Sequence, residues 1–285
     1  MNIPINLVML VSYDYKFVYT SLPLLYQYMD KICLSIDKKR LTWTGNIFNI
    51  DDSFFEWIRE IDKEQKIYIY EDDFYISNNT PKENDIRQRN MSRDFIGSEG
   101  WCIQIDSDEY FYDFGRFITF LKNISPKGKM VISCKLIPIY KMNENGYFII
   151  NTLETVNIAA INFEKYTGIR GIAGAKKIKT FFTAFHQSWA RSEDEIRFKF
   201  ANWGHANDFN SEIYYEQWRN LTDANFIEYT NVHPSKTPQK WPSISYIPNI
   251  NINNLIMSVR DIKRKIIKQR FLKYCLKFYR PGFFQ

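Results

Sequence analysis

The sequence predicts an α/β protein in which a mostly parallel, Rossmann-like sheet is flanked by helices and followed by a C-terminal helical extension. Apolar runs of strand length alternate with segments of helical spacing through the first 105 residues, the order typical of parallel sheets. Hydrophobic residues make up 45% and charged residues 25% of the 285-residue chain, which excludes collagen-like, coiled-coil and wholly disordered classes.

The first half predicts four strands separated by three helices. The expected strands cover residues 6–12, 31–36, 66–70 and 101–105, and the expected helices cover 21–29, 51–61 and 84–96. Asp51 or Asp52 is a suitable cap for the second helix. The apolar N-terminus is interrupted by Pro4 and Asn6 and has no cationic lead, so we interpret it as a core strand instead of a signal peptide.

The second half has a different pattern. A helix is expected at 114–123, and two strands at 129–140 and 147–151 are joined by the turn-forming run Asn-Glu-Asn-Gly. The glycine-rich segment 168–174 predicts a flexible loop. A helix opens at Ser192, another is expected at 211–221, and residues 231–254 predict an extended, irregular segment. We divide the chain into a main domain (1–210), an extension (211–257) and a tail (258–285).

The net charge of +6 is concentrated in the tail. Nine basic residues and one acidic residue lie between 258 and 285, so the tail carries +8 and the rest of the chain −2. Its apolar residues recur at helical spacing, which predicts an amphipathic helix over 258–280 that could lie on an anionic membrane surface or dock on the body. The near-neutral body argues against a nucleic-acid partner. Four scattered cysteines suit a reducing, cytoplasmic location, with peripheral contact at the inner face of the membrane.

The most informative motif follows the fourth expected strand. There the run WCIQIDSDEYF delivers Asp106, Ser107, Asp108 and Glu109 to the strand's carboxyl end. Ligands of α/β sheets bind beyond these ends, and two carboxylates one residue apart can point to the same side. Oxygen ligands of this kind suit Mg²⁺ or Mn²⁺ shared with a diphosphate.

With these features the chain resembles glycosyltransferases of the GT-A fold, and most closely the bacterial family 2-like enzymes that build surface polysaccharides. The resemblance covers roughly residues 5–245. It includes the DSDEYF motif, the stretch AFHQSWARSEDEIRFKFANWGHANDF at 184–209 and the stretch NVHPSKTPQKWP at 231–242. The Asp-x-Asp motif is its specific part.

The resemblance implies a metal site. Asp106 and Asp108 would hold Mn²⁺ or Mg²⁺ against the diphosphate of a nucleotide sugar, and His186 is the expected third ligand. His205 and His233 are the alternatives. Glu109 matches the acid that often follows the motif, although it could equally bond to loop amides.

The resemblance also implies a donor site at the strand ends. Its expected residues are Ser12, Tyr13, Asp37, Arg87, Arg89, Asp106 and Ser107. Tyr13 would stack on the base and Asp37 would bond to the base or ribose, whereas the alternatives are ordinary packing and a turn. Arg89 suits a diphosphate, but the helix face that carries the arginines could also be solvated and paired with its own acids.

An inverting glycosyltransferase needs a general base, normally Asp or Glu. Asp194 or Glu193 resembles the acidic motif that the family places at the start of an acceptor-side helix. Ser192-x-x-Glu195 is also a capping box, which explains the same acids locally. Glu154 is a competitor for the base.

The sequence therefore predicts a metal-dependent glycosyltransferase that moves a sugar from a nucleotide-diphosphate sugar, with UDP favoured, to a glycan or lipid-linked glycan. Inversion is the favoured stereochemical outcome. Two alternatives stay open: a nucleotidyltransferase-like enzyme, and a non-enzymatic membrane or interaction module that uses the basic tail. Glycine-rich phosphate loops of the P-loop and dinucleotide-binding types are absent from the sequence.

Overall fold

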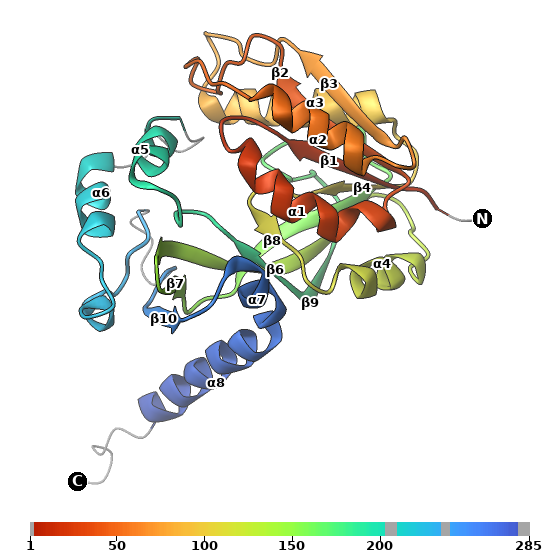
Figure 1. Ribbon diagram of the computed structural model, residues 1–285. Coiled ribbons are helices and arrows are strands. Elements are labelled where there is room, and N and C mark those ends of the chain that lie inside the picture. Colours follow the sequence, from red (N-terminus) through yellow and green to blue (C-terminus); the bar gives the residue numbers. More distant parts are fainter. Residues whose placement is uncertain (1–2, 203–209, 235–239, 279–285) are drawn as a thin grey trace.

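A computed structural model describes residues 3–202, 210–234 and 240–278. It confirms the α/β class, with a central sheet flanked by helices (Figure 1). The N-terminal half of the sheet is parallel throughout, in the order β3-β2-β1-β4. Its strands are β1 (Ile5–Leu10), β2 (Lys31–Asp37), β3 (Ile67–Asp72) and β4 (Trp101–Gln104).

Helices cover both faces of this half because its buried strands alternate apolar side chains between the faces. Leu7 and Met9 of β1 point into a core that also contains buried side chains of α1, α2 and α4. Val8 and Leu10 point the other way, into a smaller core with Ile96 of α3. The helices are α1 (Val18–Leu25), α2 (Asp52–Ile61), α3 (Pro81–Ile96) and α4 (Phe114–Lys122).

The second half of the sheet combines parallel and antiparallel pairs around the long strand β6, which pairs with β7, β8 and β9. Strand β8 joins the two halves through its antiparallel pairing with β4. The strands are β5 (Glu109–Tyr110), β6 (Met130–Asn143), β7 (Gly146–Ile150), β8 (Glu154–Ile161), β9 (Lys176–His186) and β10 (Ile244–Pro248).

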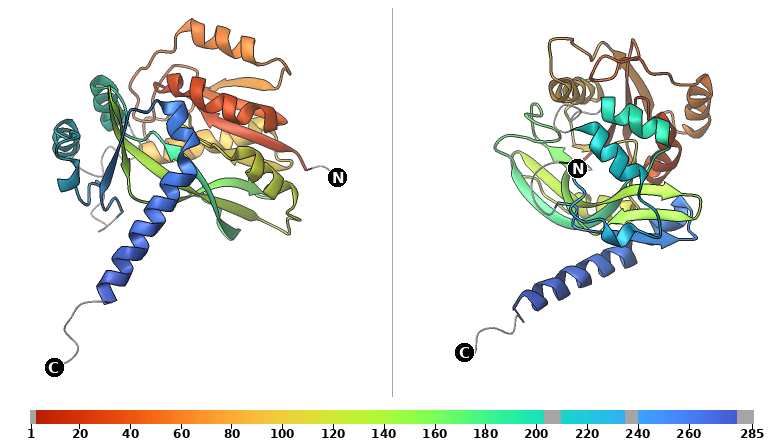
Figure 2. Two further views of the ribbon diagram at one scale, coloured as in Figure 1. Left: turned by 60° about the horizontal axis from the view of Figure 1, so that its bottom comes forward. Right: turned by 90° about the vertical axis from the view of Figure 1, so that its left-hand side faces the viewer.

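The C-terminal elements pack on this second half. Strand β10 extends the sheet beside β7, and the first turns of α8 bury Val259, Ile262 and Ile266. Figure 2 shows the rest of α8 extending away from the body in both views. The remaining helices are α5 (Glu193–Asn202), α6 (Ser211–Arg219), α7 (Ile252–Met257) and α8 (Val259–Phe278), with short 3₁₀ turns at Tyr15–Phe17, Tyr26–Tyr28 and Phe226–Glu228. Among the described residues, no helix combines the length and apolar character needed to cross a membrane.

The structure adds elements that the sequence pattern missed. Strands β8 and β9 had not been predicted, and β10 and the start of α7 fall in the segment expected to be irregular. Because β10 belongs to the same sheet as β7, the proposed extension (211–257) shares its hydrogen bonding with the main domain. The domain boundaries themselves stay a prediction.

Candidate functional site

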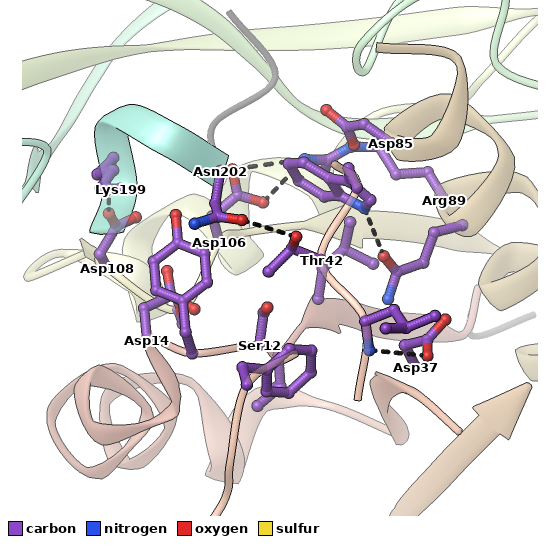
Figure 3. A pocket seen from close by; sticks show the side chains of 18 of the residues that line it. Ser12, Asp14, Asp37, Thr42, Asp85, Arg89, Asp106, Asp108, Lys199 and Asn202 are labelled. Carbon is purple, nitrogen blue, oxygen red and sulfur yellow. Dashed lines mark hydrogen bonds and ion pairs between the residues drawn. The ribbon is translucent and has the colours of Figure 1, made fainter. Parts of the chain in front are cut away.

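A cavity of about 220 Å³ lies where β1 has β2 on one side and β4 on the other. This is the switch point of the parallel half, where loops leave neighbouring strands in opposite directions and open a crevice. Three of those loops line the cavity: the one after β1, the one after β2 and the one after β4. Figure 3 shows their side chains converging on it, together with Lys199 and Asn202 from α5.

The loop after β2 forms one wall and is held by buried hydrogen bonds. Asp37 accepts from the backbone N–H groups of Lys39 and Leu41 with one oxygen and from Phe74 with the other. Trp43 donates its indole N–H to Gln88, 2.8 Å away, which fixes the ring beside the cavity. Asp37 therefore has the turn role left open by the sequence and is also part of the cavity wall.

Asn202 connects α5 to this loop. Its amide oxygen accepts from the hydroxyl groups of Thr42, at 2.9 Å, and Thr44, at 2.8 Å. These bonds span about 160 residues of sequence, so the cavity is closed by two distant parts of the chain.

Asp106 occupies the end of β4 and is the more accessible of the two motif aspartates, with 34% of its side chain exposed. Arg89 approaches one carboxylate oxygen at 3.1 Å and Arg170 the other at 2.5 Å. Burial raises the pKa of this carboxyl group, but the two guanidinium groups outweigh burial, so the pKa of Asp106 is below its ordinary value. Asp106 is thus an anion held between two fixed cations.

Asp108 is buried, with 5% of its side chain exposed, and is surrounded by three basic groups. Its Oδ2 accepts from Arg191 at 2.7 Å and from Lys199 at 3.3 Å, and its Oδ1 lies 3.5 Å from His186 Nε2. Burial opposes ionisation, yet Lys199 and His186 favour it more strongly, and the pKa of Asp108 is well below the ordinary value. Asp108 is therefore also a paired anion.

His186 reaches this cluster because β5 pairs with the end of β9, which sets Glu109 opposite His186. Glu109 accepts from the backbone N–H of Asp106 at 3.1 Å and pairs with Arg170 at 3.0 Å. Its bond to a loop amide is the alternative that the sequence had left open for this acid. Burial raises the pKa of Glu109 despite the Arg170 charge.

A second cavity, of about 610 Å³, lies on the other side of the acidic motif. The two cavities share three lining residues: Asp106, Ile169 and His186. Polar and charged side chains are prominent in the second one, including Glu154, whose Oε1 accepts from the Trp241 indole at 2.7 Å. The end of β4 is therefore accessible from two directions.

The structure brings most of the predicted residues to the first cavity. Ser12, Tyr13, Asp37, Arg89, Asp106, Ser107, Asp108 and His186 all line it. Their assigned roles stay predictions.

Three predicted residues line neither cavity. Arg87 donates to the backbone oxygen of Asp73, and Glu193 is bonded to the Tyr215 hydroxyl. Asp194 belongs to the first turn of α5, where Ser192 and Glu195 form the reciprocal bonds of a capping box. Of the alternative histidines, His233 lines the second cavity and His205 lies outside the described residues.

Sequence reasoning missed four charged residues of the site: Asp14, Arg170, Arg191 and Lys199. Asp14 follows Tyr13 directly, and Arg170 interrupts the glycine-rich loop, with a backbone φ of 53°. Arg191 and Lys199 stand in the 184–209 stretch that carries the family resemblance. For all four residues, the signal in the sequence was a charged side chain inside or directly beside a segment that had already been assigned a role.

The acids of the motif are of the kind that binds a divalent cation through oxygen. Within the described residues, no group of three or more His, Cys, Asp and Glu side chains could hold a metal ion. The carboxylate oxygens of Asp106 and Asp108 are already paired with arginine, lysine or histidine nitrogens. The donor set therefore does not fit a metal ion as arranged, and the Mn²⁺ or Mg²⁺ site stays a prediction.

Comparisons with known proteins give distant structural matches. No protein-family model matches the chain, and no curated protein matches its sequence. Residues 1–349 of S. aureus TarS match with 13% identity and a TM-score of 0.30, over 50% of this chain and 40% of that one. The same fragment in complex with UDP-GlcNAc matches with 10% identity and a TM-score of 0.30, over 50% and 36%.

HddC from Yersinia pseudotuberculosis, complexed with GMP-PN, matches with 12% identity and a TM-score of 0.36, over 69% of this chain and 97% of that one. In the two TarS matches, by contrast, this chain spans less than half the length of the TarS chain. Similarity at this level assigns neither a family nor a function to the chain.

Proposed function

We propose that the protein is a glycosyltransferase that moves a sugar from a nucleotide-diphosphate sugar to a glycan or lipid-linked glycan. UDP-sugars are the first donors to test. The stereochemical outcome that we expect is inversion of configuration at the anomeric carbon of the sugar. One observation carries the proposal: two cavities meet at Asp106 and His186, at the carboxyl end of β4. A transferase needs two substrates whose reacting atoms come together in this way.

The first cavity suits the nucleotide. Trp43 and Phe48 offer apolar rings, and Asp37 and Gln88 offer polar groups to a base or ribose. Asp106 is shared with the second cavity, and Asp108 lies 3.5 Å from the shared residue His186 and is bonded to Lys199. The diphosphate and its sugar would reach the acceptor at these residues.

The second cavity suits a polyhydroxylated acceptor. Thr152, Thr155 and Lys240 supply hydroxyl and ammonium groups beside Glu154. Of the three candidate bases, Glu154 lines a cavity, whereas Glu193 and Asp194 line neither. We therefore favour Glu154 as the base and keep Asp194 and Glu193 as the candidates that the sequence motif supports.

The test is a screen of nucleotide sugars with the full chain. We expect one donor to release its nucleoside diphosphate slowly in water and faster when a glycan acceptor is present. A nucleotidyltransferase-like enzyme would instead leave the nucleotide sugars intact, and would release pyrophosphate when given a nucleoside triphosphate and a sugar 1-phosphate. If no donor binds and none is consumed at any divalent-ion concentration, the glycosyltransferase proposal fails and the interaction-module alternative takes its place.

We also propose that the protein is cytoplasmic and contacts the anionic inner membrane surface peripherally, without binding nucleic acid. A specific observation favours membrane contact. The groove between α8 and β9 is lined by two exposed apolar side chains, Phe181 and Ile267, with 71% and 45% of their surfaces exposed. Phe271, one turn beyond Ile267 on α8, is 66% exposed. Basic side chains from α4 and α8, including Arg116, Lys263 and Arg264, border the same groove. Apolar rings next to basic groups suit the boundary between headgroups and acyl chains.

A further inference from the structure

The acidic motif is neutralised by side chains of the chain itself. Asp106 lies between Arg89 and Arg170, and Asp108 is bonded to Arg191 and Lys199. All four basic side chains are at least nine-tenths buried. A divalent ion at these carboxylates would have to displace cations that the surrounding structure holds in place.

Lys199 differs from Arg89 in how its donors are used. An ammonium group has three N–H donors. Within the described part of the chain, Asp108 is the one acceptor bonded to Lys199, at 3.3 Å. By contrast, Arg89 is bonded to Asp85, Gln104 and Asp106.

Lys199 also faces the first cavity. It lines the first cavity from α5, and Figure 3 shows it beside Asp108 and across the cavity from Asp37. Asn202, one turn further along α5, is bonded to Thr42 on the opposite wall, which fixes the helix against the cavity. The ammonium group is therefore held in the first cavity beside Asp108, which lies 3.5 Å from the shared residue His186, and it has donors left for a ligand.

On the basis of the proposed function, we propose that Lys199 binds the diphosphate of the donor and supplies the positive charge that a divalent ion supplies in metal-dependent enzymes. Asp108 and Arg191 are positioning residues, since they hold the ammonium group through Asp108 Oδ2. In the transfer step, the bond between the anomeric carbon and the diphosphate oxygen breaks and its electron pair stays on that oxygen. The acceptor oxygen forms the new bond to carbon and gives its proton to the base. Lys199 stays protonated and donates to the departing diphosphate.

The experiment measures binding of UDP, GDP, CDP, ADP and dTDP to the full chain by titration calorimetry, in excess EDTA and in Mn²⁺ or Mg²⁺. For the nucleotide that binds, we expect similar affinity with and without the metal ion. Lys199→Met should weaken that binding about ten- to a hundredfold, the loss typical of one charge-assisted hydrogen bond. Lys199→Arg should recover most of it, and Lys122→Met, at an exposed position on α4, should bind as the parent does. Melting temperatures check that each variant is folded.

The outcomes separate this inference from the proposed function. Binding that appears only with Mn²⁺ or Mg²⁺ overturns the role of Lys199 and leaves a nucleotide-dependent transferase in place. Binding in EDTA that is unchanged in folded Lys199→Met also overturns the role of Lys199, because another group of the protein then supplies the positive charge at the diphosphate. If no nucleotide binds in either condition, the proposed function fails and this inference fails with it.

Discussion

The two cavities that meet at Asp106 are built differently. The first lies at the ends of parallel strands, and its wall residues Asp37, Trp43 and Asn202 are fixed by hydrogen bonds to distant segments of the chain. The second is larger, about 610 against 220 Å³, and its lining includes the exposed side chains of Thr155 and Lys240.

Under the proposed function, this difference indicates that the two cavities bind different substrates. A small cavity with fixed walls selects one ligand, whereas a larger polar cavity with exposed walls accommodates part of a longer molecule. Substitutions on the first side should therefore change donor binding, and substitutions on the second side should change transfer to the acceptor. A residue shared by both cavities should affect both.

The largest effect is expected from Asp106→Asn, because Asp106 belongs to both cavities and balances Arg89 and Arg170. We expect kcat/KM for transfer to fall about a thousandfold, equivalent to ~4 kcal/mol of transition-state stabilisation. Steady-state kinetics with donor and acceptor varied in turn measure it. Asp94→Asn is the matched control, since Asp94 also pairs with an arginine but is 68% exposed on α3. Parent-like rates in folded Asp106→Asn would place the reaction elsewhere.

The next effect tests the second cavity. Glu154→Gln keeps an oxygen that can accept from Trp241 but removes the carboxylate. We expect kcat for transfer to fall about a hundredfold, the lower end of what a general base contributes, with nucleotide affinity unchanged. Asp194→Asn, on the capped first turn of α5, should leave kcat within about twofold. The reverse result would make the acidic motif of α5 the source of the base.

A smaller effect should be confined to the first cavity. Trp43→Ala removes a ring that Gln88 holds against the cavity, and stacking of a base on an aromatic side chain is worth about 1–3 kcal/mol. We expect nucleotide affinity to fall at least about fivefold. Trp43→Phe should recover much of that loss, and the acceptor KM should not change. A change in acceptor KM with no change in nucleotide affinity would reverse the assignment of the two cavities.

The same contrast between the two sides governs how much could be predicted from sequence. The parallel half was predictable because its strands are short, mostly apolar runs that end at a polar residue, as at Ile105 and Asp106. The strand ends place Ser12, Asp37 and Asp106 at one edge of the sheet. Their convergence follows from topology alone.

The basic residues around the acidic motif and the second half of the sheet depend on contacts that no local sequence pattern encodes. Arg170 pairs with Asp106, 64 residues earlier (170 − 106), and Arg191 and Lys199 bond to Asp108, 83 and 91 residues earlier. Strands β8 and β9 also lack a clear alternation at their exposed ends. Trp189 and Trp241, whose rings could equally have stacked on a sugar, are buried together in a core with Tyr140. An aromatic residue has the same sequence signature in a binding wall and in a core, so only the tertiary structure distinguishes them.

The smallest effect concerns membrane contact, which should alter neither cavity. The first turns of α8 are fixed by the buried residues Val259 and Ile262, so deleting the whole tail would damage the core. The double substitution Ile267→Ser and Phe271→Ser changes only exposed side chains. We expect it to weaken binding to vesicles containing phosphatidylglycerol several-fold, because each buried apolar side chain contributes about 1.5–3 kcal/mol at most and these are partly inserted.

Vesicle sedimentation measures this binding, with neutral phosphatidylcholine vesicles as the reference and Ile227→Ser, an exposed apolar position away from α8, as the matched control. Binding should also fall with salt, since basic side chains near an anionic surface contribute about 1 kcal/mol each and are screened. Equal binding of the double variant and the parent would show that the apolar face of α8 does not enter the bilayer. Activity on a soluble acceptor should be unchanged in either case, because the substituted residues line neither the donor nor the acceptor cavity.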